Sequence, residues 1–155
     1  MHRLVIIAIC LFFSGCSLLP QKGTPQSPLE LRGILQGTTV VSGYVIVAAD
    51  LLVPVGSKLV IKAGTTLLVR NSESTKIDPE YLSSQTEILV RGSLIVDGRD
   101  DAKISFMPET PVAAGEVAWA GIILDGAIDS AIRHAEILQP ETGILLINSS
   151  PEILN

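Results

Sequence analysis

The sequence is poor in aromatic residues, in positive charge and in cysteine, and each scarcity narrows what the chain can be. Phe, Trp and Tyr make up only 4 % of the 155 residues, so aliphatic side chains must fill the interior. Ile, Leu and Val favour strands over helices. The hydrophobic content of 47 % is high enough to close a core, which argues against disorder, and the length fits one domain.

Positive charge is scarce relative to negative charge. The chain has 11 basic and 16 acidic residues, a net charge of −5. Residues 1–15 contain Arg3 and no acid, so a chain without them has 10 basic and 16 acidic residues, a net charge of −6. Affinity for nucleic acid comes largely from Lys and Arg on phosphates, so nucleic acid is not an expected partner.

The chain also lacks an apolar run of the roughly 20 residues that a membrane-spanning helix needs. The run LVIIAICLFF, residues 4–13, follows a short basic start and precedes Ser14 and Gly15. This order is typical of an export signal. The residues FSGC, 13–16, resemble the lipobox of bacterial lipoproteins, with Phe in the place where Leu is usual. The alternative is an ordinary signal peptide and a chance cysteine.

The lipobox resemblance implies a signal peptide over residues 1–15 and a lipid on Cys16. Cys10 would be removed, so the mature chain would have no free thiol for a disulfide or a metal site. The two or three acyl chains, such as palmitate, of such a lipoprotein hold it stably in a membrane. Ser17 stands where Asp would retain a lipoprotein in the inner membrane, so we expect the outer membrane of the cell envelope.

Residues 16–37 are interpreted as a lipid-anchored linker that ends in a cap of the following domain. The segment SLLPQKGTPQ has the Pro and Gly content of a linker. The segment SPLELRGILQ, residues 27–36, fits a short helix with Ser27 as its N-cap, and it fits a first strand equally well.

From residue 38 to residue 155 the apolar residues come in bursts of three to six, separated by Gly, Pro, Asp, Asn or Ser. This pattern predicts short strands with tight corners. Residues 86–106 contain three such strands, with corners at Arg91–Gly92 and at DGRDD. Alternation along these strands predicts that four side chains point inward while their neighbours face the surface: Ile88, Val90, Leu94 and Val96.

Two pairs of bursts look like internal copies. The burst around Gly64 matches the burst around Gly92, 28 residues on, and the burst around Gly121 matches the one around Gly143, 22 residues on. Polar inserts at residues 71–85 and 107–117 interrupt the pattern. A three-strand repeat predicts a coil of stacked turns, because one turn cannot bury its own apolar face.

These bursts, among them LVPVGSKLVIKAGTTLLV, ILVRGSLIVDG, SAIRHAEIL and TGILLINSSPEILN, resemble a right-handed parallel β-helix. Residues 44–155 are similar to the pectin-lyase-like superfamily as found in exported bacterial lipoproteins. The resemblance implies a fold of about four turns and no particular activity, because such folds host many functions. The alternative fold is an antiparallel β-sandwich.

The last apolar burst, PEILN, is followed by no helix or loop that would cover it. Exposed strand edges invite pairing with another chain. The sequence leaves two interpretations open: a chain truncated relative to its relatives, or self-association through this strand with a second copy or a partner.

The acidic cluster DGRDD is the first candidate ligand site, through Asp97, Arg99, Asp100 and Asp101. The family resemblance implies Ca²⁺-binding carboxylates and a basic residue that removes a proton, but family sites draw these groups from successive turns. The structural alternative is that corner Asp residues form turns through bonds to their own backbone.

Trp119 and His134 are the other residues that chemistry singles out. Trp119 precedes a burst and is a candidate platform for stacking a sugar, or it covers a corner of the core. His134 lies between Arg133 and Glu136 without a nucleophile or metal partners, so we expect a surface histidine. No motif selects paired carboxylates among Asp125, Asp129, Glu136 and Glu141.

The sequence contains no phosphate-binding loop, zinc signature or nucleophile elbow. We therefore assign no catalytic residue, metal or cofactor. The expected function is a non-catalytic, lipid-anchored scaffold or binding module with carbohydrate as its small ligand. The alternative function is a surface-anchored polysaccharide lyase or hydrolase of the pectate-lyase-like type.

Overall fold

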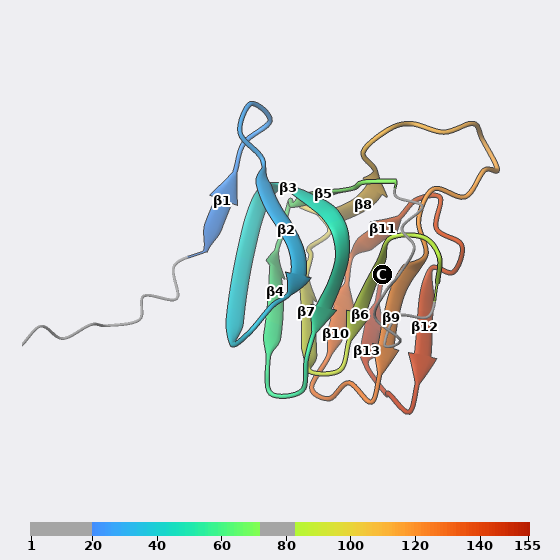
Figure 1. Cartoon of the computed structure of the whole chain (residues 1–155). Helices are drawn as coiled ribbons and strands as arrows, with labels where there is room; N and C mark the ends of the chain where they lie inside the picture. Colours follow the sequence, from blue (N-terminus) through green and yellow to red (C-terminus); the bar gives the residue numbers. More distant parts are fainter. Residues whose placement is uncertain (1–19, 72–82) are drawn as a thin grey trace, which may run out of the picture.

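Every regular element of the computed structural model, which describes residues 20–71 and 83–155, is a β-strand. The 13 strands of this part of the chain form one curled sheet (Figure 1), and every pairing between them is parallel. The described ranges hold no helix that is long and apolar enough to span a bilayer. The all-β prediction is confirmed, and the antiparallel sandwich is wrong.

The strands lie on three sides of the curled sheet. The first side holds, in order, β1 (Gln21–Gly23), the start of β3 (Thr38–Val53), β4 (Lys58–Lys62), β7 (Ser93–Asp97), β10 (Ala131–Arg133) and β13 (Glu152–Leu154). The second side holds the start of β2 (Leu29–Ile34), the middle of β3, β5 (Thr66–Val69), β8 (Ile104–Pro108) and β11 (Ala135–Ile137). The third side holds the ends of β2 and β3, then β6 (Glu87–Val90), β9 (Gly121–Asp125) and β12 (Ile144–Ile147).

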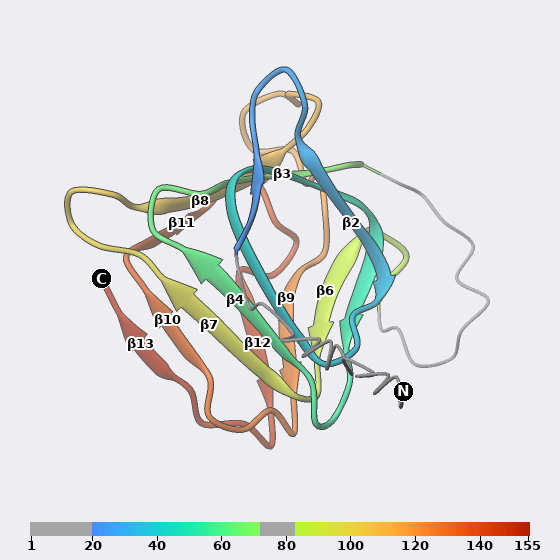
Figure 2. The same ribbon diagram turned by 90° about the vertical axis from the view of Figure 1, so that its left-hand side faces the viewer.

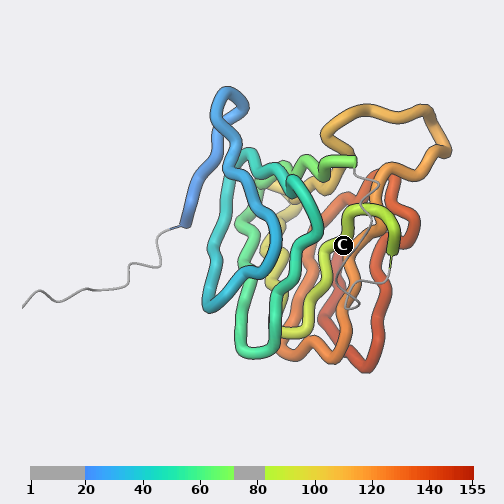
Figure 3. Tube along the Cα trace, in the orientation of Figure 1, coloured from blue at the N-terminus to red at the C-terminus, as the bar shows by residue number. Residues whose placement is uncertain are grey.

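The chain visits the three sides in turn and then returns to the first side beside the strand it laid there before. We call one such passage a layer. Strand β4 pairs with β7 and β7 with β10, while β5 pairs with β8 and β6 with β9. Figure 2 looks toward the β1 end and shows the sides enclosing the interior, and Figure 3 shows the path of the chain from one layer to the next. The arrangement is compatible with a parallel β-helix.

The interior is a stack of aliphatic side chains from all three sides. On the second side, Val45, Leu67 and Phe106 occupy matching positions on successive strands, and none of them is exposed. The four side chains predicted to point inward, Ile88, Val90, Leu94 and Val96, all belong to this core. Parallel pairing places like residues above one another, so each layer covers the apolar face of the one before.

Three neighbours of these inward residues depart from the prediction, because Glu87, Leu89 and Ser93 are all buried. Leu89 should face the surface by alternation, yet it is fully buried, in a second cluster with Leu52 and Ile123. These three residues occupy matching positions on β3, β6 and β9. The third side therefore carries a buried aliphatic row on its outer face as well as on its inner face.

The stacked strands begin before residue 38, where the sequence placed their start. Strand β1 pairs with β3 from Gln21 to Gly23, and β2 pairs with β3 from Leu29 onward. The segment that fitted a helix or a strand is a strand. The cause is β3, a 16-residue strand whose edge offers backbone partners to the preceding segment.

The two predicted inserts fare differently. Most of the first lies outside the described residues, which resume at Ser83. The second was placed at 107–117, but β8 continues to Pro108, and the stretch from 109 to 120 contains no strand.

One of the two predicted internal matches is confirmed and the other is wrong. Gly121 and Gly143 are neighbours on the third side, where the Ile122 amide donates to the Gly143 carbonyl. Gly64 does not stack on Gly92: its amide bonds to the Ala102 carbonyl at a corner between the first and second sides. Gly92 lies at a corner between the third and first sides, so the two glycines belong to different corners.

Strands β11, β12 and β13 each pair on one edge only among the described residues. Strands β12 and β13 carry half-exposed apolar side chains, including Leu146 (43 %), Ile153 (50 %) and Leu154 (49 %). Leu146 and Ile153 pair with core residues Leu124 and Ile132. The aliphatic stack is thus accessible at this end of the described coil.

Candidate functional site

The predicted acidic site is the corner that joins β7 to β8. Reciprocal backbone hydrogen bonds between Arg99 and Ala102, of 3.2 and 3.0 Å, close this corner. Gly98 packs against the Arg133 carbonyl so closely that a Cβ would overlap it. The local fold follows from the residue types, because Asp and Gly favour tight turns.

Two carboxylates of this corner, Asp97 and Asp101, lie beside cations. Asp97 lies 3.6 Å from the Lys62 ammonium on the neighbouring strand, and Asp101 lies 3.4 Å from Arg99 within the corner. Asp97, at the end of β7, belongs to a surface ladder between layers. Across residues 20–71 and 83–155, no group of three or more His, Cys, Asp or Glu side chains is placed to hold a metal ion.

The fold brings the His134 side chain to this corner from the next layer. It occupies the corner between β10 and β11 with a φ of 45°, so the alternation of side chains along a strand does not apply to it. Its Nδ1 atom lies 3.0 Å from Asp100 Oδ1. The two atoms are close but not aligned as a hydrogen bond, since Nδ1 is buried without a hydrogen-bond partner. The imidazole is partly buried, not a fully exposed surface group.

The remaining carboxylates that the sequence considered are dispersed along the coil. Asp125 pairs with Arg91 at 3.0 Å, and Glu136 pairs with Lys103 at 3.4 Å. Asp129 lies in a corner with a φ of 47°. Glu141 follows β11 on the way to β12. Asp125 and Glu136 thus take part in ion pairs between layers, and the four carboxylates do not form an acid–base pair for sugar hydrolysis.

An ion pair with two hydrogen bonds joins Arg70 to Glu109. Arg70 donates from Nε and a terminal nitrogen to the two carboxylate oxygens, at 2.6 and 3.0 Å. Arg70 follows β5 and Glu109 follows β8, so the pair bridges adjacent layers. The hydrogen bond from Arg70 lowers the pKa of Glu109 below its ordinary value, and the same bond raises the pKa of Arg70.

We expect this pair to make stability depend on pH. A carboxylate whose pKa is lower in the folded than in the unfolded chain stabilises the fold above the ordinary Glu value of about 4.3. That contribution is lost as the pH falls through the lowered pKa of Glu109. Urea unfolding of the native chain and of Glu109→Gln should therefore differ at neutral pH and converge in acid.

A double-variant cycle with Arg70→Gln isolates this pair from other carboxylates. The coupling between residues 70 and 109 should be favourable at neutral pH and vanish in acid. A coupling of zero at neutral pH would contradict the assignment of the ion pair.

Trp119 is fully buried, which corrects its candidacy as a sugar platform. Its ring stacks on Phe106 with centroids 6.4 Å apart, and its indole N–H donates to the Leu138 carbonyl at 2.9 Å. A ring that stacks a sugar must expose at least one of its faces to solvent, and the Trp119 ring exposes neither. The residue instead covers a corner of the core.

The buried position predicts the fluorescence of the only tryptophan in the chain. Native protein should emit at short wavelength and resist quenching by acrylamide, and unfolding in urea should shift the emission to the red. Added polysaccharide should leave the native emission unchanged. Strong acrylamide quenching of the native state would contradict the burial of this ring.

A serine ladder at the corner between the third and first sides was missed in the sequence. Ser57, Ser93 and Ser130 are less than a tenth exposed. Ser57 Oγ accepts from the Gly37 amide at 3.0 Å, and Ser130 Oγ accepts from the Leu94 amide at 3.0 Å. The signal is a Gly or Asp before Ser at the start of a strand, in VGSKLV, RGSLIV and IDSAIR.

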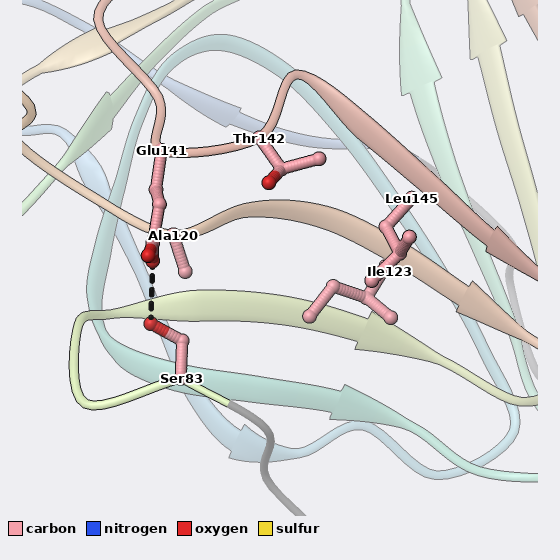
Figure 4. Close-up of a pocket in the computed structure, with 6 residues that line it drawn as sticks. All are labelled: Ser83, Ala120, Ile123, Glu141, Thr142 and Leu145. Carbon is pink, nitrogen blue, oxygen red and sulfur yellow. Dashed lines mark hydrogen bonds between the residues drawn. The ribbon is translucent and has the colours of Figure 1, made fainter.

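Two shallow depressions lie on the outer surface. Figure 4 shows one of about 150 Å³ on the third side, where the Ser83 hydroxyl donates to the Glu141 carboxylate at 3.1 Å. Its remaining lining is Ala120, Ile123, Thr142 and Leu145. The other, of about 210 Å³, lies beside the serine ladder and Lys58. Both are below the range of about 300–1,000 Å³ that is usual for small-molecule sites.

Comparison with known proteins places the chain in no group. No family model matches the sequence, and neither a curated protein nor a solved structure matches it significantly.

Proposed function

We propose that the protein is a lipoprotein of the cell envelope whose domain is a right-handed parallel β-helix similar to the pectin-lyase-like superfamily. The ordered signal-like start and the residues FSGC support the lipid anchor at Cys16, which lies outside the described residues. The side-by-side parallel strands support the β-helix, with four strand spacings between β3 and β13 on the first side. Ser17 supports the outer over the inner membrane.

In this proposal the domain acts as a non-catalytic scaffold or binding module. The observation that carries this proposal is that charged side chains on the surface pair with one another between adjacent layers. The pairs Arg70–Glu109, Arg91–Asp125 and Lys103–Glu136 each bridge adjacent layers. Surface ion pairs are individually weak. Repeated along a coil, together with the buried serines, they hold one layer to the next, which suits a rigid support.

Two kinds of partner belong to the proposal. Carbohydrate is the small ligand, bound weakly on the outer faces of the coil. Self-association is the second, because β12 and β13 each pair on one edge only among the described residues, beside half-exposed Leu146 and Ile153. Sedimentation of the native chain and of Ile153→Asp tests this contact: the variant should be monomeric at concentrations where the native chain associates.

A combined binding and turnover screen tests the choice between scaffold and enzyme. The protein is incubated with acidic and neutral polysaccharides, with and without Ca²⁺, and both retention and released sugars are measured. We expect retention of some polysaccharides without release of products. Calcium-dependent release of unsaturated sugars would overturn the proposal in favour of a lyase.

A variant set locates the source of any such activity. Activity that is lost in Asp97→Ala/Asp100→Ala/Asp101→Ala but kept in the exposed-surface control Glu30→Ala would assign it to the β7–β8 corner. Unchanged polysaccharide retention in the triple variant would place the binding surface elsewhere on the coil.

A further inference from the structure

Charge is distributed unevenly along the coil. Residues 20–92 contain seven basic and six acidic residues, a net charge of +1. The layers from Ser93 onward contain three basic and ten acidic residues, a net charge of −7, with His134 counted as neutral. Because the layers follow one another from left to right in Figure 1, this division is a charge difference between the earlier and the later part of the coil along its axis.

The ion pairs between adjacent layers have the same direction of charge, from a basic to an acidic side chain. In five ion pairs of Lys or Arg the cation lies on the earlier layer and the carboxylate on the later one: Lys62–Asp97, Arg70–Glu109, Arg91–Asp125, Lys103–Glu136 and Arg133–Glu152. The first layer keeps Lys22 and Arg32 with one acid, Glu30. The layer of β7, β8 and β9 has exposed acids such as Asp100, Asp101 and Glu116.

The start of the coil is also close to the proposed lipid. Strand β1 begins at Gln21, five Cα steps from Cys16. A fully extended chain covers at most about 3.6 Å per residue, so the first strand lies within about 18 Å of the anchored residue. A tether this short keeps the first layer near the lipid headgroups. The coil axis can then be perpendicular to the membrane, so that the coil stands, or parallel to it, so that the coil lies flat.

We propose that the coil stands on an anionic membrane, with its first layer at the headgroups and its acidic layers pointing away. The inference rests on the lipid anchor proposed above. Basic residues near an anionic surface are attracted to it, and acidic residues are repelled, over a Debye length of about 8 Å in physiological salt. A coil that lies flat brings the layers of net charge −7 against the same surface.

The standing orientation fixes the height of each corner above the bilayer. Gln36 and Ser150 lie on the corner between the third and first sides, before β3 and before β13, and both are exposed. Four strand spacings of about 4.8 Å separate them, which is about 19 Å along the coil axis. In a flat coil the two positions lie at nearly equal heights.

The test uses the full lipidated chain in vesicles of phosphatidylethanolamine and phosphatidylglycerol. Gln36→Cys and Ser150→Cys each add one free thiol for a donor fluorophore, and a headgroup-labelled lipid is the acceptor. We expect strong energy transfer from position 36 and much weaker transfer from position 150. Equal transfer, or stronger transfer from position 150, overturns the inference.

Charge variants test whether electrostatics sets the orientation. Lys22→Glu with Arg32→Glu should reduce the difference between the two positions in these vesicles and leave it unchanged in phosphatidylcholine vesicles. The control Arg99→Glu reverses a charge on a distant layer and should keep the full difference. An unchanged difference in the double variant contradicts the electrostatic cause.

Mass spectrometry of the same sample separates the two proposals. A lipidated chain with equal transfer at both positions refutes the standing orientation and leaves the anchored scaffold intact. A chain without lipid refutes both.

Discussion

Replacing Gly121 by valine is expected to lower the free energy of unfolding by about 4 kcal/mol or more, enough to unfold many domains of this size. Gly121 has a φ of 121°, which side chains with a Cβ rarely adopt. A Cβ at this position would also lie far inside contact distance of the Thr142 carbonyl oxygen on the next layer. Backbone strain and a steric overlap therefore act together.

Gly143 provides the matched control for this change. It lies beside Gly121 on the next layer, and a Cβ there would meet no atom within 4 Å. Gly143→Ala should change the free energy of unfolding by less than about 0.5 kcal/mol, as is usual for open surface positions. Urea unfolding followed by circular dichroism measures both variants. Equal effects of the two substitutions would contradict the close stacking of these layers.

Replacing Cys16 by serine is expected to abolish membrane attachment. The thiol alone can form the thioether to lipid, and the lipid-dependent signal cleavage requires that modification first. The variant should accumulate as an uncleaved precursor that still carries residues 1–15. Fractionation with detergent extraction, followed by mass spectrometry of the N-terminal peptide, measures both effects.

The second cysteine is the natural control for the lipid site. Cys10→Ser should leave cleavage, lipid mass and membrane attachment unchanged, because Cys10 lies within the segment that is removed. A native chain whose N-terminus is unmodified and begins after Cys16 would refute the lipid anchor. Such a result would support an ordinary signal peptide.

The positions of the strands were predictable because local residue types decide them. The strands β6, β7 and β8 fall within or next to the three bursts of residues 86–106, and the two corners between them lie at the expected residues. Short aliphatic bursts interrupted by Gly and Asp leave little choice of local structure. Burial of Leu89 was not predictable, since it depends on what lies against the outer face of the sheet.

The pairing of the strands was harder to predict, because glycines at different corners look alike in sequence. Gly92 was matched with Gly64, which is 28 residues away. The structure places it opposite Ser57 instead: β4 pairs with β7 from Lys58 and Ser93 onward, and the Ser93 amide bonds to the Ser57 carbonyl. A Gly-Ser dipeptide marks this corner in both layers, at Gly56-Ser57 and at Gly92-Ser93. Comparison of whole dipeptides would have found the corner, although the ladder is shifted by one residue from that match.

The candidate site was predictable in composition but not in environment. The turn-forming alternative for the Asp residues agrees with the closed β7–β8 corner. Their cationic neighbours, such as Lys62 beside Asp97, come from other layers, so the sequence separation of 35 residues concealed them. The contact of His134 with Asp100 depends on the same stacking. Burial of Trp119 depends on Phe106 and Leu138, which also approach it only in the folded coil.

Cross-linking of cysteine pairs tests the stacked register most directly. Lys62 and Asp97 are neighbours on β4 and β7, at the roughly 4.8 Å spacing that a disulfide can bridge. Oxidation of Lys62→Cys/Asp97→Cys should close a disulfide rapidly in the native state. The pairs Lys62→Cys/Arg133→Cys, which lies two layers apart, and Lys62→Cys/Val90→Cys, which follows the rejected match of Gly64 with Gly92, should remain reduced. Rapid closure of the Lys62–Val90 pair, with none in the Lys62–Asp97 pair, would contradict the coil described here.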